Sequence, residues 1–152
     1  MVKNILIIIL ITVLILLVYQ LFFNHPPTKI VKMDLKGKTY QLEIAKTIPQ
    51  QAKGLMNRTS LCQNCGMIFV FGLELPQAFW MKNTLIPLDI IFLDKNGKII
   101  NIVTATPQSA VSDNQLRLYR STAPAKFVIE LNAGDATKLS LVPDNIIDIP
   151  SL

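Results

Sequence analysis

Two acidic residues stand inside apolar, strand-like runs of this chain, and they are its first candidates for chemistry. Asp89 lies within L-D-I-I-F-L and Glu130 within F-V-I-E-L. A carboxylate on a half-buried face needs a partner, because burying an unpaired charge is costly. Arg58 and Lys82 are the available cations. The two acids could form a structural network within the sheet, or they could be the catalytic carboxylates of a hydrolase.

A second candidate is a ligand site around the only tryptophan. Trp80 belongs to the hexapeptide F-W-M-K-N-T at residues 79–84. If residues 78–82 form a strand, Trp80 and Lys82 point to one face, while Phe79 and Met81 point to the other. An aromatic ring beside hydrogen-bonding groups suits a sugar, whereas a lone tryptophan is more often part of a core. The ligand-binding candidates are Arg58, Trp80, Lys82, Asn83, Asp89 and Glu130.

Cys62 and Cys65 are the only cysteines and form a single C-x-x-C pair. A zinc site needs four ligands, and one pair supplies two of them. A thioredoxin-like site would need the pair to open a helix, whereas this pair precedes Gly66 and a strand-like run. We expect a local disulfide in an oxidising compartment. A thiol–disulfide function for the pair, or free structural thiols, are the alternatives.

Several other mechanisms lack the residues that they need. The only histidine, His25, directly follows the apolar N-terminal run, so histidine-based triads and histidine–zinc sites have no base or ligand. There is no glycine-rich phosphate loop, and we predict neither a metal nor a cofactor. The net charge of +5 comes from scattered lysines and only three arginines. We therefore expect no nucleic-acid partner.

The N-terminal segment predicts a membrane anchor. Residues 4–23 carry no charge, and twenty helical residues span roughly 30 Å, the thickness of a hydrocarbon core. No alanine-rich cleavage site follows the run, which argues against the alternative of a cleaved signal peptide. We expect a single transmembrane helix within residues 1–25, with the lipid bilayer as its partner, followed by one domain over residues 26–152.

The remainder of the chain reads as mostly β. Thr47, Pro49 and Gln50 indicate the start of a short helix that ends by Met56, and a second brief helix is predicted over residues 135–139. An Asn-Gly pair at residues 96–97 predicts a hairpin with a type I′ turn. The predicted strands cover residues 30–35, 39–45, 67–71, 78–82, 88–94, 99–103, 127–131 and 146–149. Short strands with one or two helices are typical of a β-sandwich or barrel.

Several motifs in a fixed order resemble domain-of-unknown-function family 192 over about residues 29–149. They are R-T-S-L at 58–61, G-M-I-F-V-F at 66–71, F-W-M-K-N-T-L-I-P-L-D-I-I-F-L-D at 79–94 and P-A-K-F-V-I-E-L-N-A-G at 124–134. The resemblance implies a compact jelly-roll-like β-sandwich, commonly exported or membrane-tethered in bacteria and archaea, and no established activity. The chain departs from the family at Pro143-Asp144, where a Gly-Asp turn is usual, and in the loop at 109–117, which lacks the cysteines of many relatives.

The charges beside the apolar run bear on which side of the membrane the domain lies. Lysines follow the apolar run at Lys29, Lys32, Lys36 and Lys38, which by charge alone would place the domain in the cytoplasm, but long domains translocate largely regardless of charge. Because members of the family that the chain resembles are commonly exported, we expect an extracytoplasmic, envelope-associated module. It would bind a ligand or assist a glycan or protein partner. The alternatives are a hydrolase using Asp89 and Glu130 and a thiol–disulfide role for Cys62 and Cys65.

Overall fold

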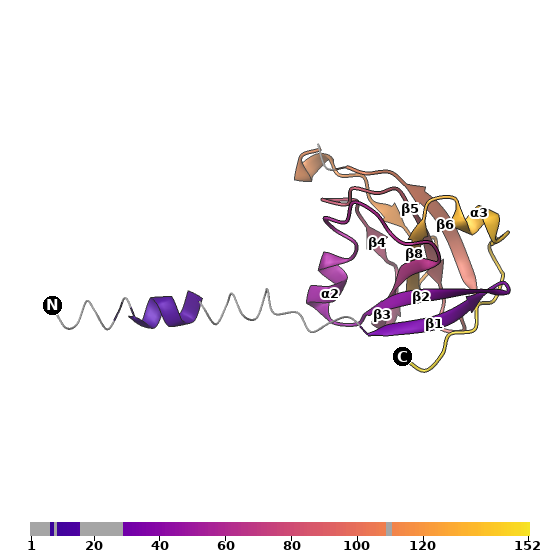
Figure 1. The fold of residues 1–152 in the computed structure, drawn as a ribbon, viewed down its shortest axis with the longest axis horizontal. Helices are drawn as coiled ribbons and strands as arrows, with labels where there is room; N and C mark the ends of the chain where they lie inside the picture. Colours follow the sequence, from indigo (N-terminus) through magenta and orange to yellow (C-terminus); the bar gives the residue numbers. More distant parts are fainter. Residues whose placement is uncertain (1–6, 8, 16–28, 109–110) are drawn as a thin grey trace.

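The structure is a computed structural model that describes residues 7, 9–15, 29–108 and 111–152 (Figure 1). Residues 9–15 are helical and exposed. Most of the predicted anchor at residues 1–25, including most of the bilayer-contacting run at 4–23, lies outside the described residues. Among the described residues, no helix is both long enough and apolar enough to span a bilayer.

One six-stranded sheet is the centre of the fold, with the strand order β1-β2-β3-β8-β5-β6. Its strands are β1 (Ile30–Leu35), β2 (Lys38–Ala45), β3 (Cys65–Leu75), β5 (Leu88–Leu93), β6 (Ile99–Ala105) and β8 (Ala125–Asn132). Neighbours run antiparallel except β2 and β3, which are parallel. A small second sheet pairs β4 (Ala78–Phe79) with β7 (Tyr119–Arg120).

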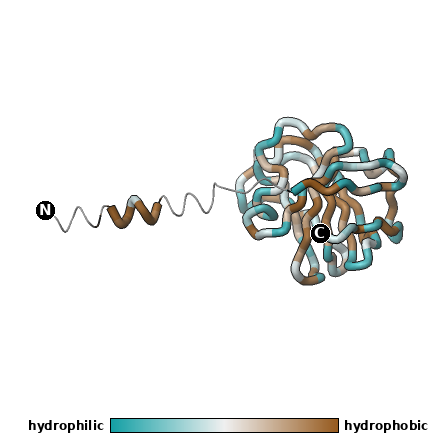
Figure 2. The backbone as a smooth tube through the Cα atoms, turned by 60° about the horizontal axis from the view of Figure 1, so that its bottom comes forward, coloured by the Kyte–Doolittle hydropathy of each residue, from teal (hydrophilic) through white to brown (hydrophobic). Residues whose placement is uncertain are grey.

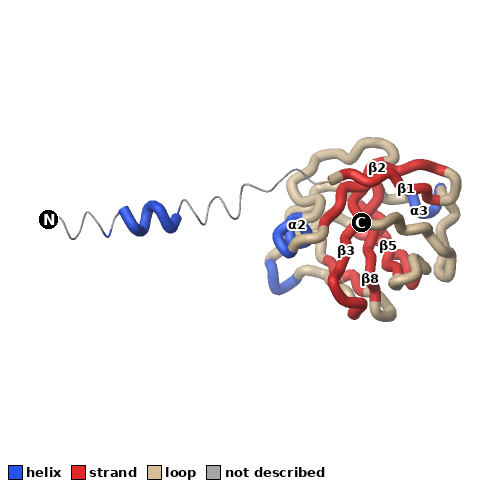
Figure 3. The backbone as a smooth tube through the Cα atoms, turned by 90° about the horizontal axis from the view of Figure 1, so that it is seen from below, coloured by secondary structure: helices blue, strands red, loops and turns tan. Residues whose placement is uncertain are grey.

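The helices are short and lie on opposite sides of the sheet in Figures 1 and 3. They are α2 (Ile48–Lys53), α3 (Asp135–Lys138) and the 3₁₀ turn η1 (Asp113–Gln115). The predicted capping box before α2 is confirmed: the Gln50 amide donates to Thr47 Oγ1 at 3.4 Å, and the Thr47 amide donates to Gln50 Oε1 at 3.0 Å. These bonds satisfy amides that have no partner within the helix.

The mainly β prediction with short helices is confirmed, but the jelly-roll-like sandwich or barrel differs from the observed arrangement. The described strands form one large mixed sheet and one small two-stranded sheet, and the chain crosses over through α2 to bring β3 parallel to β2. Two predicted strands are also corrected. The strand over 78–82 ends at Phe79, and the strand over 146–149 is reduced to one bridge between Lys98 and Ile146.

The hairpin between β5 and β6 is confirmed, whereas its predicted type I′ turn is wrong. Gly97 has a φ of 76°, but Asn96 does not share a positive φ, which a type I′ turn requires at both positions. The side chain of Asp94 accepts from the amides of Asn96 and Lys98, at 2.8 and 2.9 Å. These two bonds stabilise a longer loop, in which glycine alone takes the left-handed conformation.

Apolar side chains form a core on each face of the large sheet. Figure 2 shows hydrophobic residues through the centre of the domain and hydrophilic residues in many of the loops around it. We call the first core the Asp89 face; it includes Ile91, Leu93, Ile129 and Leu131. We call the second the Glu130 face; it includes Phe69, Ile90, Phe92 and Val128. Successive residues of β5 and β8 therefore alternate between the two cores.

Different parts of the chain cover the two faces. The Asp89 face is covered by α3 and the C-terminal segment, which contribute Ala136, Leu141 and Ile147. The Glu130 face is covered by the loop after α2 and by the region around the small sheet, which contribute Leu55 and Met81. Both covers leave open space: a pocket of about 470 Å³ lies beside Ile149 and Leu152 at the edge of the first face, and a cavity lies over Glu130 on the second.

Candidate functional site

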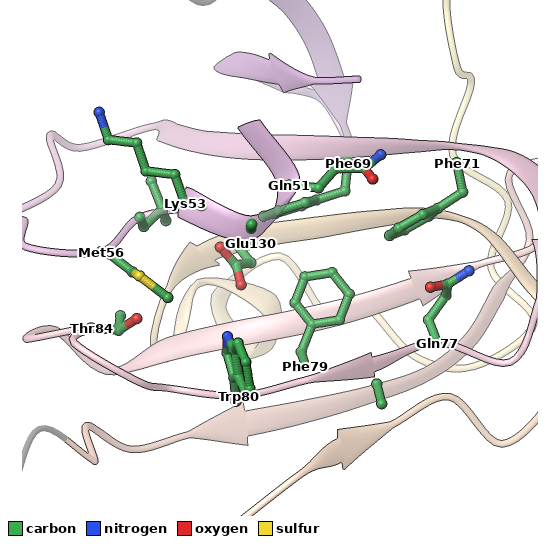
Figure 4. A pocket seen from close by; sticks show the side chains of 14 residues that line it. Gln51, Lys53, Met56, Phe69, Phe71, Gln77, Phe79, Trp80, Thr84 and Glu130 are labelled. Carbon is green, nitrogen blue, oxygen red and sulfur yellow. The ribbon is translucent and has the colours of Figure 1, made fainter. Parts of the chain in front are cut away.

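A cavity of about 220 Å³ opens on the Glu130 face (Figure 4). Its apolar wall includes Leu55, Met56, Phe69, Phe71, Phe79 and Trp80. Its polar lining comprises Gln51, Lys53, Gln77, Thr84 and Glu130. The residues come from α2, β3, β4 and β8 and from the loops beside them, so the site exists only once distant segments have packed together.

Aromatic packing fixes one wall of the cavity. The ring of Phe79, on β4, lies edge-on to three others, with centroid distances of 4.9 Å to Phe69, 6.3 Å to Phe71 and 5.9 Å to Phe92. Edge-to-face contacts at these distances are favourable beyond the area that they bury. The wall is therefore preorganised in the absence of a ligand.

The opposite wall is α2 and the turn that follows it. Gln51 anchors the helix to the sheet, because its Nε2 donates to the backbone oxygen of Val70 at 2.9 Å. Gly54 directly follows the helix, and its φ of 46° is a conformation that residues with a Cβ rarely adopt. A Cβ at this position would also come within 3.4 Å of the Phe69 ring. Glycine thus allows the chain to pass close above the aromatic wall.

Trp80 stands at the edge of the cavity, and 46% of it is exposed. The next residue, Met81, is fully buried in the core, and regular strand pairing ends at Phe79. The ammonium of Lys82 lies 6.0 Å from the centre of the Trp80 ring and forms an ion pair with Asp113 at 2.5 Å. Lys82 is thus beside Trp80 but is not part of the cavity lining.

Glu130 forms the floor of the cavity. It lies on β8 between Met67 of β3 and Ile90 of β5, and only 4% of it is exposed. Its Oε2 atom is buried and has no hydrogen-bond partner. Loss of hydration raises the pKa of the Glu130 carboxyl from 4.5 to about 8. This pKa favours the protonated form of the carboxyl at neutral pH. The carboxyl faces the aromatic wall (Figure 4).

Asp89 lies on the other face of the sheet. Its Oδ1 accepts from the Thr104 hydroxyl at 2.8 Å, and its Oδ2 accepts from the Ala136 amide at 2.9 Å. In the register of β5 and β8, Asp89 pairs with Leu131, and the next residue pairs with Glu130. Alternation then directs the two carboxyls to opposite faces. The structure does not bring Asp89 and Glu130 into one cleft, as a paired carboxylate mechanism would require.

The other two candidates have structural contacts. Both guanidinium nitrogens of Arg58 bind the Glu43 carboxylate, at 2.5 and 2.8 Å, and this hydrogen bonding raises the pKa of Arg58. Asn83 has a φ of 52°, which asparagine tolerates better than most residues, and its backbone oxygen accepts from the Asn57 amide at 2.8 Å. Of the six predicted ligand-binding residues, Trp80 and Glu130 line the cavity.

Cys62 and Cys65 form a disulfide at the start of β3. Asn132 reaches the same loop, and its Nδ2 donates to the backbone oxygen of Cys62 at 3.2 Å. The bridge thus closes the loop that leads into the sheet, away from the cavity lining. In the part of the chain that the structure describes, no cluster of acidic, cysteine and histidine side chains could hold a metal ion.

Most of the cavity wall was not predicted from the sequence. Phe69 and Phe71 alternate along β3 and so share a face, which was a usable signal. Phe79 was assigned to the face opposite Trp80, yet both line the cavity. Gln51 was seen only as part of a short helix. No local pattern shows that this helix lies against the sheet opposite Trp80.

The family model DUF192 (Uncharacterized ACR) matches residues 30–149, which is most of the chain. The chain belongs to the DUF192 family. The predicted resemblance is thereby confirmed, and the matched residues of this DUF192 protein include the whole cavity, from Gln51 to Glu130.

Two solved structures are similar to this DUF192 protein. One, from Sinorhizobium meliloti 1021, is described as a "putative transcription regulator"; it is 32% identical, with 82% of this chain and 96% of that chain covered and a TM-score of 0.68. The other, a protein of unknown function from Novosphingobium aromaticivorans DSM 12444, is 34% identical, with 79% and 83% covered and a TM-score of 0.67. No curated protein matches the chain significantly.

Proposed function

We propose that this protein is a ligand-binding module whose site is the cavity between Trp80 and Glu130. The observation that supports it is the Glu130 carboxyl, which is 4% exposed, has an unpartnered oxygen and faces the cavity (Figure 4). A buried polar group without a partner costs about 1–3 kcal/mol. A bound ligand that hydrogen-bonds to Glu130 would remove this cost, so the site gains more from occupancy than an apolar cavity would.

The dimensions of the cavity limit the ligand. Pockets for drug-sized ligands measure about 300–1,000 Å³, whereas this one measures about 220 Å³. The ligand is therefore a small molecule, or the terminal group of a larger one such as an envelope glycan or peptide. Trp80 and Phe79 supply a flat apolar surface, and Glu130 supplies one polar contact at the floor.

We also propose that the module works outside the cytoplasm, on a single-pass membrane tether. The tether is inferred from the uncharged composition of residues 4–23, with residues 26–152 as one domain. The disulfide between Cys62 and Cys65 supports an oxidising compartment, since such bonds are rare in the cytosol. A DNA-binding role, which the description of one structural neighbour would suggest, is not favoured by three arginines and scattered lysines.

A thermal-shift screen of the full-length protein in non-ionic detergent tests the binding function. The ligands are cell-wall glycans, oligosaccharides, nucleotides and small amines. A ligand at a hundred times its Kd stabilises the folded state by about 2.7 kcal/mol, which is an easily measured shift. We expect such a shift in the wild type and its loss in Trp80→Ala.

Leu118→Ala is the matched control, because Leu118 is 42% exposed, close to the 46% of Trp80, and does not line the cavity. This variant should keep the ligand-induced shift. A flat screen on a cooperatively melting protein, or a shift that persists in Trp80→Ala, would overturn the proposed site.

A further inference from the structure

We infer that the cavity recognises a primary ammonium group on an apolar stem, with the ammonium bound to Glu130 and the stem packed against Phe79 and Trp80. This inference rests on the proposed binding function and specifies the chemical class of the ligand. The charge and the shape of the cavity, and not only its volume, support this ligand class.

The floor of the cavity contains an acid and no cation to neutralise it. Glu130 and Lys53 are the two charged side chains among the lining residues. Figure 4 shows the Lys53 ammonium pointing away from the Glu130 carboxyl. The residues that flank Glu130 on the adjacent strands, Met67 and Ile90, are apolar. A ligand cation is therefore the partner that this carboxyl lacks, whereas an anionic ligand would be repelled once the carboxyl ionised.

The walls also suit a cation. The faces of aromatic rings carry partial negative charge and attract ammonium groups within about 6 Å. Trp80 and Phe79 stand across from Glu130 in Figure 4, so an ammonium on the carboxyl would lie beside their rings. The Trp80 ring already has one cation near it, the Lys82 ammonium at 6.0 Å. Carboxylate and rings therefore attract the same charge.

A primary ammonium has three donors, and the cavity offers acceptors for more than one of them. Glu130 supplies two oxygens. Thr84 lines the same cavity, is 5% exposed and donates its hydroxyl to the Lys82 carbonyl at 3.3 Å, which leaves lone pairs on its Oγ1 free to accept. A neutral alcohol could bond to the protonated carboxyl but would not provide the missing charge. The site should thus discriminate an amine from its matched alcohol.

The test uses the full-length protein and the fluorescence of Trp80, which is the only tryptophan and stands at the site. The probes are n-butylammonium and 1-butanol, which differ in charge but little in shape. At neutral pH we expect the amine to bind at least about ten-fold more tightly than the alcohol, a difference of about 1.4 kcal/mol. Glu130→Gln should remove that preference, so that the ratio of the two affinities falls to about one.

Proton release gives a second readout that a purely structural Glu130 would not produce. Because the pKa of the free carboxyl is about 8, an ammonium that binds at lower pH must displace the proton. Its affinity should rise about ten-fold per pH unit as the pH approaches 8. Calorimetry of the wild type in two buffers with different heats of ionisation measures the protons released. This measurement stands even if the Glu130→Gln variant does not fold.

The outcomes separate the inference from the function on which it rests. Equal affinity for the amine and the alcohol, without proton release, would overturn the ammonium assignment but leave a binding module. No response to either probe, together with a flat ligand screen, would overturn both. A blocked lysine peptide distinguishes the sources of the ammonium: tighter binding than butylammonium assigns the site to a lysine side chain, and weaker binding assigns it to a free amine.

Discussion

Each face of the sheet buries one carboxyl, and the two carboxyls differ in their hydrogen bonding. Asp89 is 1% exposed and Glu130 is 4% exposed, and they lie one register position apart on the adjacent strands β5 and β8. Asp89 accepts hydrogen bonds from Thr104 and from the backbone of Ala136, on α3. Glu130 has a buried oxygen without a partner, beside a cavity. Equal burial thus produces one satisfied and one unsatisfied acid.

The difference lies in the cover of each face. On the Asp89 face, the backbone amide of Ala136, on α3, donates directly to the side chain of Asp89. On the Glu130 face, the loop after α2 and the segment around Trp80 leave Glu130 Oε2 without a hydrogen-bond partner and about 220 Å³ open. A buried carboxyl oxygen without a hydrogen-bond partner costs about 1–3 kcal/mol even when the group is protonated. The comparison therefore supports a structural role for Asp89 and the proposed binding role for Glu130.

The largest expected effect is on the pH dependence of stability in Glu130→Gln. The folded pKa of about 8 lies above the ordinary value of 4.5, so the native state retains a proton that the unfolded chain loses. The stability contribution of Glu130 is full below about pH 4.5 and is lost as the pH rises to about 8. The variant avoids this loss and should be more stable at pH 8, by on the order of 5 kcal/mol, and nearly equal to the wild type at about pH 4.

Urea unfolding of both proteins across this pH range measures the effect. Asp148→Asn is the control, since it neutralises an exposed carboxylate and should leave the curve unchanged. If wild type and Glu130→Gln keep parallel stability curves from pH 4 to pH 8, the unfavourable burial of Glu130 is refuted.

Asp89→Ala should have the next largest effect, with the opposite sign. It leaves the Ala136 amide and the Thr104 hydroxyl without their acceptor, and hydrogen bonds to a charged group contribute about 1.5–3 kcal/mol each. We expect a loss of at least about 3 kcal/mol in the free energy of unfolding at neutral pH, measured by urea denaturation. A loss below about 1 kcal/mol would remove the contrast between the two faces.

Reduction of the disulfide tests a region that belongs to neither face. Closing a loop of this length contributes about 2 kcal/mol by the chain-entropy model, so Cys62→Ser with Cys65→Ser should lower stability by about that amount. Ligand shifts at the cavity should persist in this variant. A change in binding larger than the change in stability would instead connect the thiol pair to the function.

Thr104→Val has the smallest expected effect on stability among these variants. It removes one of the two partners of Asp89 and preserves the shape of the side chain. We expect a loss of about 1–2 kcal/mol, part of the effect of Asp89→Ala. Thermal denaturation of the single and double variants forms a cycle that isolates the hydrogen bond. Additive losses would show that Thr104 and Asp89 do not interact energetically.

Local patterns in the sequence were sufficient for several features. The cap of α2 depends on residues three positions apart, and the disulfide joins cysteines three positions apart. Alternation along a single strand is also a local signal, and the structure follows it: Ile91 lies on the Asp89 face and Val128 on the Glu130 face. The hairpin after β5 was also found, but not its turn type, because Asp94 bonds to its own loop in a way that the Asn-Gly pair does not reveal.

By itself the sequence determined the family, the mainly β composition, the short helices and the two acids that had to be buried. These properties depend on residue types and on contacts between near neighbours in the chain. Only the tertiary structure decided that the acids face opposite ways, that Arg58 binds Glu43 and that α2 and Trp80 enclose a cavity over Glu130. Those outcomes depend on strand order, on the register between β5 and β8 and on the path of the crossover. Such long-range relations are set by the packing of the whole molecule, which no short stretch of sequence encodes.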